Sequence, residues 1–282
     1  GGPAAATSPR RAEKYRVVVL DVDGTMVGPD FVVSDRLRRA VRAAQDAGAT
    51  VSLATGRMMR SARRFALEAG AEGPVICYQG ALTFSAQTGE IIRHARISPA
   101  AARGALELFA ATDVHVNLYL DDEVYVERLT PWAEGYASRM EIGLKVVPSL
   151  LALADRRPTL ILAVSDTDRN VTLVPEVVRR LGRLARVTHS LPHFCEVGSP
   201  QAGKERALAH LSKLLDVPSQ QFIAFGDGKG DAGMLRWAGL GVAIEGGHPD
   251  AIAAAGQAVQ GPDKDGVARM IEELVTKGMI GA

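Results

Sequence analysis

The chain has 282 residues, with 33 basic and 32 acidic side chains, 5% aromatic residues and two cysteines. This length suffices for two domains or one large α/β unit, and we expect two domains. The balanced charge and the lack of a basic stripe with interleaved aromatics argue against nucleic acid as the main partner. No apolar run reaches the roughly twenty residues that a bilayer-spanning helix needs, so we expect no membrane span.

The two cysteines and the start of the chain indicate where the protein works. Cys77 and Cys195 stand in apolar, strand-like contexts, which favours buried free thiols in a reducing cytoplasm over a disulfide. Residues 1–14 have no apolar core and no periodicity, so they predict a flexible tail rather than a signal.

From Tyr15 onward the chain alternates strands and helices. The pattern predicts strands over 16–20, 50–54 and 74–78, with helices after Ser34 and over 58–69 between them. Continuous apolar strands separated by helices indicate a parallel sheet that is covered on both faces.

The pattern changes between residues 82 and 190. Here we predict strands over 91–95, 115–120 and 124–127, a helix over 99–111, and a hairpin turn at Asp121-Asp122. Polar and apolar residues alternate in these strands, which is typical of an antiparallel α/β insertion with one exposed face, such as a lid.

The parallel pattern resumes with a helix over 204–215 and strands over 222–225 and 241–244. The predicted fold class is therefore α/β, a doubly wound parallel sheet with an inserted α/β cap domain. The predicted core domain comprises residues 15–81 and 191–282, and the predicted cap comprises residues 82–190.

Two carboxylates follow the first strand in the segment Asp21-Val22-Asp23-Gly24-Thr25. A sharp turn at Gly24 can bring Asp21 and Asp23 to one small site. Crowded carboxylates either take up a proton or bind a divalent cation, and both outcomes suit phosphate chemistry. An Asp-Gly turn that only ends a strand is equally consistent with this segment alone.

Three further segments place polar groups at strand or helix ends. Thr55 follows the second strand, and Asp227 and Asp231 follow the strand over 222–225. The carboxyl ends of parallel strands lie at the edge where ligands bind in such sheets. Lys204 begins a helix, where a cation is poorly placed unless an anion lies nearby. The ordinary alternatives are a strand-to-helix turn, a loop carboxylate with a helix N-cap, and a solvated lysine.

Taken in order, Asp-Val-Asp-Gly-Thr, Thr-Gly-Arg, Lys204 and Gly-Asp-(three residues)-Asp resemble the four motifs of the haloacid dehalogenase-like (HAD) phosphohydrolases. The resemblance extends from Tyr15 to the C-terminus. The insertion between the second and third motifs is similar to the Cof-like branch with its cap domain. The resemblance implies a Rossmann-like core and a phosphoric monoester hydrolase.

The resemblance also implies roles for the motif residues. Asp21 would be the nucleophile and Asp23 the general acid and base. Mg²⁺ would be held by Asp21, the backbone carbonyl of Asp23, and Asp227.

The remaining groups would bind the phosphoryl group. Thr55, Lys204 and the backbone at Gly24 and Gly56 would contact its oxygens, with Lys204 neutralising charge. Asp231 would orient Lys204 or a metal-bound water.

Two positions depart from the family pattern. Gly230 stands where Asn usually precedes the last motif aspartate, and Gln79-Gly80-Ala81 stands where Asn-Gly-Ala is usual. We expect the lost amide at Gly230 to slow the site or change its selectivity, so that Gly230→Asn raises turnover.

The sequence therefore predicts a Mg²⁺-dependent phosphatase for small phosphorylated metabolites, with sugar phosphates as the first class to test. The alternatives are a phosphotransferase or phosphomutase, and a catalytically weakened regulatory protein that binds phosphate. We expect a monomer or homodimer.

Overall fold

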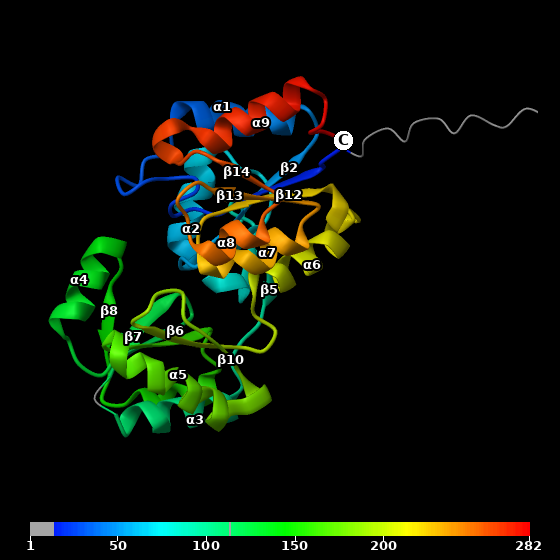
Figure 1. The fold of residues 1–282 in the computed structure, drawn as a ribbon. Helices are drawn as coiled ribbons and strands as arrows, with labels where there is room; N and C mark the ends of the chain where they lie inside the picture. Colours follow the sequence, from blue (N-terminus) through cyan, green and yellow to red (C-terminus); the bar gives the residue numbers. More distant parts are fainter. Residues whose placement is uncertain (1–13, 113) are drawn as a thin grey trace, which may run out of the picture.

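The computed structural model describes residues 14–112 and 114–282, which form two β-sheets with helices around them (Figure 1). Residues 1–13 of the predicted tail lie outside the described part. None of the helices in the described ranges is long and apolar enough to cross a membrane.

The larger sheet has eight strands in the order β14-β13-β12-β1-β2-β3-β4-β5. From β14 to β3 neighbouring strands are parallel, as predicted, whereas β4 and β5 are antiparallel additions at one edge. The strands are β1 (Val17–Leu20), β2 (Thr50–Ala54), β3 (Val75–Cys77), β4 (Leu82–Phe84), β5 (Ile91–His94), β12 (Phe222–Gly226), β13 (Leu240–Ile244) and β14 (Gln257–Val259).

Helices cover both faces of this sheet. Alternate side chains of β1 point to opposite faces, so Val18 packs in one apolar layer and Val17 in the other, and both are fully buried. The first layer contains α1 (Asp35–Asp46), α2 (Met59–Ala69) and α9 (Gly266–Thr276), and the second contains α6 (Lys204–Leu215), α7 (Ala232–Trp237) and α8 (Pro249–Ala254).

The smaller sheet has six strands in the order β10-β11-β9-β6-β7-β8, antiparallel except for the parallel pair β7 and β8. The predicted turn at Asp121-Asp122 joins β6 to β7, with both residues at positive φ. The elements of this unit are α3 (Pro99–Ala110), β6 (His115–Leu120), β7 (Glu123–Val126), α4 (Pro131–Met140), β8 (Leu144–Val146), β9 (Leu160–Val164), α5 (Thr167–Leu181), β10 (Arg186–Thr188) and β11 (Phe194–Gly198). Short 3₁₀ segments lie at Tyr78–Gly80, Leu150–Arg156, Gly182–Leu184, Ser219–Gln221, Lys229–Asp231 and Pro262–Lys264.

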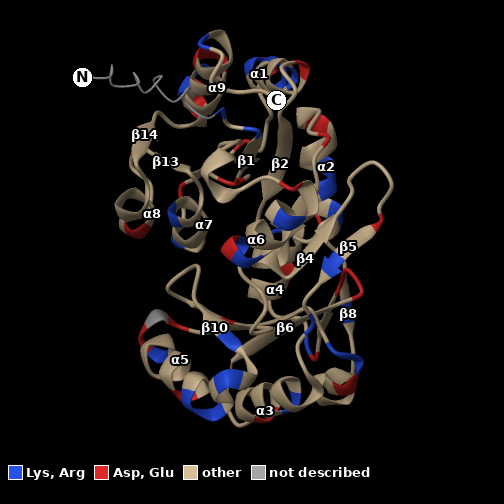
Figure 2. Cartoon of the chain, turned by 90° about the vertical axis from the view of Figure 1, so that its right-hand side faces the viewer, with Lys and Arg blue, Asp and Glu red and all other residues tan. Residues whose placement is uncertain are grey.

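The two faces of the smaller sheet have different partners. Leu118 and Ile161 pack with α3 and α5, which lie on the side away from the larger sheet (Figure 2). Tyr119, Leu160 and Leu162 belong instead to the apolar cluster that includes the larger sheet. The face that α3 and α5 leave uncovered is therefore turned toward the larger sheet, and α4 lies on this side.

The structure shifts both expected domain boundaries, 81/82 and 190/191. β4 and β5 pair in the larger sheet because the chain turns back through Gln79 and Gly80, both at positive φ, and runs antiparallel to β3. β11 pairs with β9 and β10 in the smaller sheet. The chain therefore leaves the larger sheet after His94 and leaves the smaller one after Gly198.

Candidate active site

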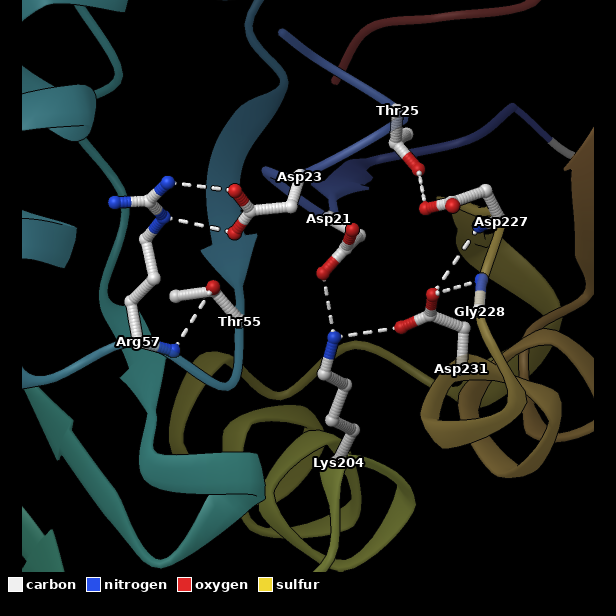
Figure 3. A network of polar contacts seen from close by, with 9 residues as sticks. All are labelled: Asp21, Asp23, Thr25, Thr55, Arg57, Lys204, Asp227, Gly228 and Asp231. Atoms are coloured by element: carbon white, nitrogen blue, oxygen red, sulfur yellow. Dashed lines mark hydrogen bonds and ion pairs between the residues drawn. The ribbon is translucent and has the colours of Figure 1, made fainter. Parts of the chain in front are cut away.

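Three neighbouring parallel strands bring the predicted groups to one edge of the larger sheet. β1 lies between β12 and β2, with Leu20 in register with both Phe225 and Leu53. Asp21 follows β1, Thr55 follows β2 and Asp227 follows β12 (Figure 3). The strand ends therefore meet as the sequence predicts.

Lys204 forms two short ion pairs at the start of α6. Its Nζ donates to Oδ1 of Asp21 and to Oδ1 of Asp231, each at 2.6 Å (Figure 3). The three side chains are buried. The anions that a lysine at a helix N-terminus requires are therefore these two carboxylates.

Burial and charge act in opposite directions on this group. Burial lowers the pKa of Lys204, but the charges of Asp21 and Asp231 outweigh it and raise the pKa overall. For Asp21, burial raises the pKa first and Asp231 adds to the effect, while Lys204 opposes it. Burial and Asp231 also raise the pKa of Asp227. The site thus carries more negative charge than one ammonium can balance.

This surplus charge fits a divalent cation. Asp21, Asp227 and Asp231 each offer a carboxylate oxygen, and these oxygens lie within 4.8 Å of one another. Carboxylate oxygens are the ligands that Mg²⁺ prefers. A cation here would lower the pKa values of Asp21 and Asp227, which burial and the neighbouring carboxylate raise.

Asp231 is the least available of the three carboxylates. One oxygen accepts from Lys204, and the other accepts from the backbone N–H groups of Asp227 and Gly228 at 3.1 and 2.9 Å. Asp231 therefore fixes Lys204 and the loop, and its side chain makes no capping bond to α7. Thr25 donates to Oδ1 of Asp227 at 2.9 Å and orients that carboxylate.

Asp23 faces away from Lys204 and pairs with Arg57. The guanidinium donates to both carboxylate oxygens, with Nε to Oδ2 at 2.7 Å and Nη2 to Oδ1 at 2.6 Å. Arg57 is 7% exposed, and its Cζ lies over the rings of Phe31 and Phe65, at 4.9 and 4.6 Å from their centroids. Sequence reasoning assigned Arg57 no role, although it stands in the Thr-Gly-Arg motif.

The hydroxyl group of Thr55 is available to donate a hydrogen bond to a ligand. Its Oγ1 accepts the backbone N–H of Arg57 at 3.1 Å, so the hydroxyl can still donate to a phosphoryl oxygen.

Gly24 and Gly56, the two glycines predicted at the site, leave space for the side chains of Asp227 and Gln79. Gly24 has φ +77°, and a Cβ there would lie 2.4 Å from Oδ2 of Asp227. Its own N–H donates to the carbonyl of Val27 at 2.9 Å, so this amide is already used. A Cβ on Gly56 would lie 2.7 Å from Nε2 of Gln79.

The same Gln79 also lies next to Gly230. A Cβ at position 230 would be 3.1 Å from Oε1 of Gln79. The two departures from the family pattern therefore share one space, whereas the sequence alone presented them as two unrelated positions and only the change at Gly230 as a lost amide. In the sequence, the one indication of this contact was that both residues follow strands of the predicted parallel sheet, Gln79 after β3 and Gly230 after β12.

A cavity of about 440 Å³ opens above these groups. Asp21, Asp23, Lys204 and Asp227 line its floor, and residues of the smaller sheet and α4 line the opposite wall. The site can thus hold a small anionic ligand against Asp21.

Comparison with known proteins shows which family this chain belongs to. The family model described as haloacid dehalogenase-like hydrolase matches residues 18–271, a span that contains all four motifs. The chain belongs to this family. Two curated relatives are a putative phosphatase of Bacillus subtilis (strain 168), 28% identical over 93% of this chain and 98% of its own, and an HMP-PP phosphatase of Cronobacter sakazakii, 26% identical over 84% and 87%.

Solved structures of this family agree in fold. A protein of Thermotoga maritima has a TM-score of 0.81 at 26% identity and covers 92% of this chain and 97% of its own. A haloacid dehalogenase-like hydrolase of Bacteroides thetaiotaomicron has a TM-score of 0.83 at 25% identity, covering 93% and 100%. The chain is therefore a HAD-like phosphatase of the Cof-like branch.

Proposed function

We propose that the protein is a Mg²⁺-dependent phosphatase that hydrolyses phosphate monoesters of small metabolites through a phosphorylated Asp21. The observation that carries the proposal is the buried contact of Lys204 with Asp21 and Asp231 at the carboxyl edge of the sheet. The names of two relatives, a pyridoxal phosphate phosphatase of Escherichia coli (strain K12) and the HMP-PP phosphatase, agree with small phosphorylated substrates.

In the first step an ionised oxygen of Asp21 attacks phosphorus, and the bond between phosphorus and the ester oxygen breaks. Asp23 gives its proton to the departing alkoxide, which leaves as the alcohol. In the second step Asp23 takes a proton from water, the water oxygen attacks phosphorus, and the acyl phosphate bond breaks. Inorganic phosphate and the Asp21 carboxylate result.

The surrounding residues stabilise these steps. Lys204 holds one oxygen of Asp21 and brings a positive charge beside the transferring group. Thr55 donates its hydroxyl hydrogen to a phosphoryl oxygen. Asp21, Asp227 and the backbone carbonyl of Asp23 would hold Mg²⁺, whose charge offsets the repulsion between carboxylate and phosphate when it is bound.

Asp23 has to exchange partners to act as an acid. In the structure both of its oxygens accept from Arg57. An acid needs an oxygen that is free to carry and release a proton, so substrate binding must break at least one of these bonds. Arg57 thus acts as a positioning residue that holds Asp23 beside the cavity.

The smaller sheet with its helices would act as the cap that excludes water during the reaction. We further propose that the protein works in the cytoplasm, because Cys77 and Cys195 are buried free thiols. A monomer or homodimer remains our expectation for its oligomeric state. Burial raises the pKa of Cys77 and, to about 12, that of Cys195, and neither residue has exposed surface, which is typical of structural thiols.

Phosphate release from 4-nitrophenyl phosphate, with Mg²⁺ and with a chelator, tests the proposal. We expect turnover that requires Mg²⁺ and that Asp21→Asn abolishes, together with a hydroxylamine-sensitive phosphoryl label on the wild type. Asp46→Asn is the matched control, since Asp46 is exposed and pairs only with Arg42 among the described residues. Turnover that survives Asp21→Asn would remove this mechanism.

The alternatives give different results in the same assay. A phosphotransferase would pass the label to an added alcohol in preference to water. A regulatory protein would bind phosphate with Mg²⁺ but show no turnover.

A further inference from the structure

The wall of the cavity opposite Asp21 is built from aromatic rings. Trp132 and Tyr136 of α4 are stacked, with centroids 5.1 Å apart and an interplanar angle of 10°. Phe194 at the start of β11 meets Trp132 edge to face at 6.1 Å. All three rings are half-buried, so part of each faces the cavity. Only 5% of the residues in this chain are aromatic, so three aromatic rings at one cavity wall are more than chance placement predicts, and they indicate a binding surface.

The rest of this wall combines four apolar side chains with the polar residues Ser190, His193 and Glu196. Leu160 and Leu162 of β9, on the face turned to the larger sheet, line it together with Ile142 and Leu191. The hydroxyls of Tyr119 and Tyr136 lie 3.2 Å apart and hydrogen-bond to each other.

Glu196 is the ionisable carboxylate that the smaller sheet brings to this wall, and its oxygens are already engaged. It is 6% exposed. One oxygen accepts from the hydroxyl of Thr188 and the backbone N–H of Ser190, each at 3.1 Å, and the other from the hydroxyl of Ser190 at 2.9 Å. It therefore holds the loop before β11 and is poorly placed to accept bonds from ligand hydroxyls.

A sugar ring requires partners for several hydroxyl groups, because unpaired polar groups in a closed site are unfavourable. A flat unsaturated ring requires mainly a surface of similar polarity, and aromatic side chains provide it by stacking or edge contacts. The observed wall matches the second requirement.

We propose that the preferred substrates carry the phosphate on the side chain of a flat aromatic or heteroaromatic ring, which packs against Trp132, Tyr136 and Phe194. This inference rests on the proposed phosphatase function and narrows its substrate class. It ranks sugar phosphates, the class expected from the sequence, below flat-ring esters.

Matched probes separate ring shape from ring size. Benzyl phosphate and cyclohexylmethyl phosphate are both esters of a primary alcohol with a six-membered carbon ring, flat in the first and puckered in the second. We expect kcat/KM for benzyl phosphate to exceed that for cyclohexylmethyl phosphate by about fivefold or more, with glucose 6-phosphate below both. The corresponding phosphonates, which cannot be hydrolysed, should show the same order in Kd by calorimetry with Mg²⁺.

Variants test whether the aromatic wall causes the preference. Trp132→Leu and Tyr136→Leu should bring the benzyl to cyclohexylmethyl ratio close to one, while Trp132→Phe should keep most of it. Tyr125→Leu is the control, because Tyr125 packs with the cluster on the other side of the smaller sheet. The ratio is compared within each variant, so a general loss of stability does not imitate the effect.

The outcomes distinguish the two proposals. Hydrolysis without preference, or with preference for glucose 6-phosphate, overturns the flat-ring inference and leaves the phosphatase function standing. If no ester is hydrolysed, the phosphatase proposal fails, and the phosphonate Kd values still decide the ring preference. Equal Kd values, or a preference that Trp132→Leu and Tyr136→Leu leave unchanged, overturn the inference.

Discussion

The carboxamide of Gln79 occupies the space beside Gly230, where a Cβ would come within 3.1 Å of its Oε1. Gln79 has φ +53°, and no side-chain hydrogen bond to it is found within 14–112 and 114–282. It also lies against Gly56, so its side chain spans two loops of the site. The longer amide at 79 thus stands near the place that an Asn at 230 would take.

This contact reverses the expectation for Gly230→Asn. Because the new side chain would displace Gln79, we now expect the single variant to lower kcat/KM, and Gln79→Asn alone to lower it too. The double variant restores the family arrangement and should recover activity, with a coupling energy of about 1 kcal/mol in the cycle. Steady-state kinetics on 4-nitrophenyl phosphate give the four values.

Gly89→Asn provides the control for this cycle. Gly89 has φ +78°, a backbone conformation that Asn tolerates better than most residues, and nothing lies within 4 Å of its Cβ position, so the same substitution is made where no neighbour is displaced. If the effects of Gln79→Asn and Gly230→Asn on kcat/KM are additive, or if Gly230→Asn alone raises kcat/KM, the two side chains do not compete for the same space.

Arg57 should matter most for substrates whose leaving group needs a proton. Lysine cannot reproduce two parallel bonds to Asp23 or the contact of the guanidinium with the rings of Phe31 and Phe65. For Arg57→Lys we expect kcat/KM on ethyl phosphate to fall by about tenfold or more, and on 4-nitrophenyl phosphate much less, because nitrophenolate leaves without protonation. Arg42→Lys, at an exposed pair with Asp46, is the control. Equal losses on both substrates would show that Arg57 does not act through Asp23.

The sequence was sufficient for the groups whose positions follow from strand order. Asp21, Thr55 and Asp227 each follow a parallel strand, and the ends of adjacent parallel strands meet, so no side-chain detail was needed. Lys204 was found from its unfavourable place at a helix start.

The remaining features depend on tertiary contacts that a local pattern does not encode. The ion pair of Arg57 with Asp23 joins two loops, and each residue alone suits an exposed turn. The antiparallel pairing of β4 with β3 depends on a positive φ at Gln79. Glutamine rarely adopts this conformation, so the sequence does not predict the turn. Trp132 lies on a helix whose apolar positions predict packing but not the cavity that they face.

His94 should make the protein less stable in mild acid. Its Nε2 lies 2.8 Å from Oγ1 of Thr159, where the chain leaves the larger sheet, and burial, reinforced by Arg96, lowers its pKa to about 4. Since the unfolded chain binds the proton with an ordinary pKa near 6.5, stability is lost as the pH falls from about 6.5 to about 4. We expect His94→Gln to flatten this part of the Tm against pH curve. His210→Gln on α6 is the control, and identical slopes for wild type and His94→Gln would exclude the effect.

The stabilising effect of Mg²⁺ should grow with pH. Folding raises the pKa values of Asp21 and Asp227, so the native state binds their protons more tightly than the unfolded chain. Without metal, stability therefore falls as the pH rises from the ordinary carboxyl range through the raised values. Mg²⁺ at the same oxygens replaces the protons and removes the repulsion, so its affinity rises with pH.

Thermal unfolding with and without MgCl₂ between about pH 5 and about pH 8 measures this linkage. The gain in Tm from Mg²⁺ should be smallest at the acid end and largest at the alkaline end. Asp227→Asn removes one ligand and one source of repulsion, so this variant should be more stable than wild type without metal and gain less from Mg²⁺. Asp46→Asn should behave as wild type in both conditions. A gain that is constant across this pH range would show that Mg²⁺ does not compete with protons at Asp21 and Asp227, and the cation would then have to bind elsewhere.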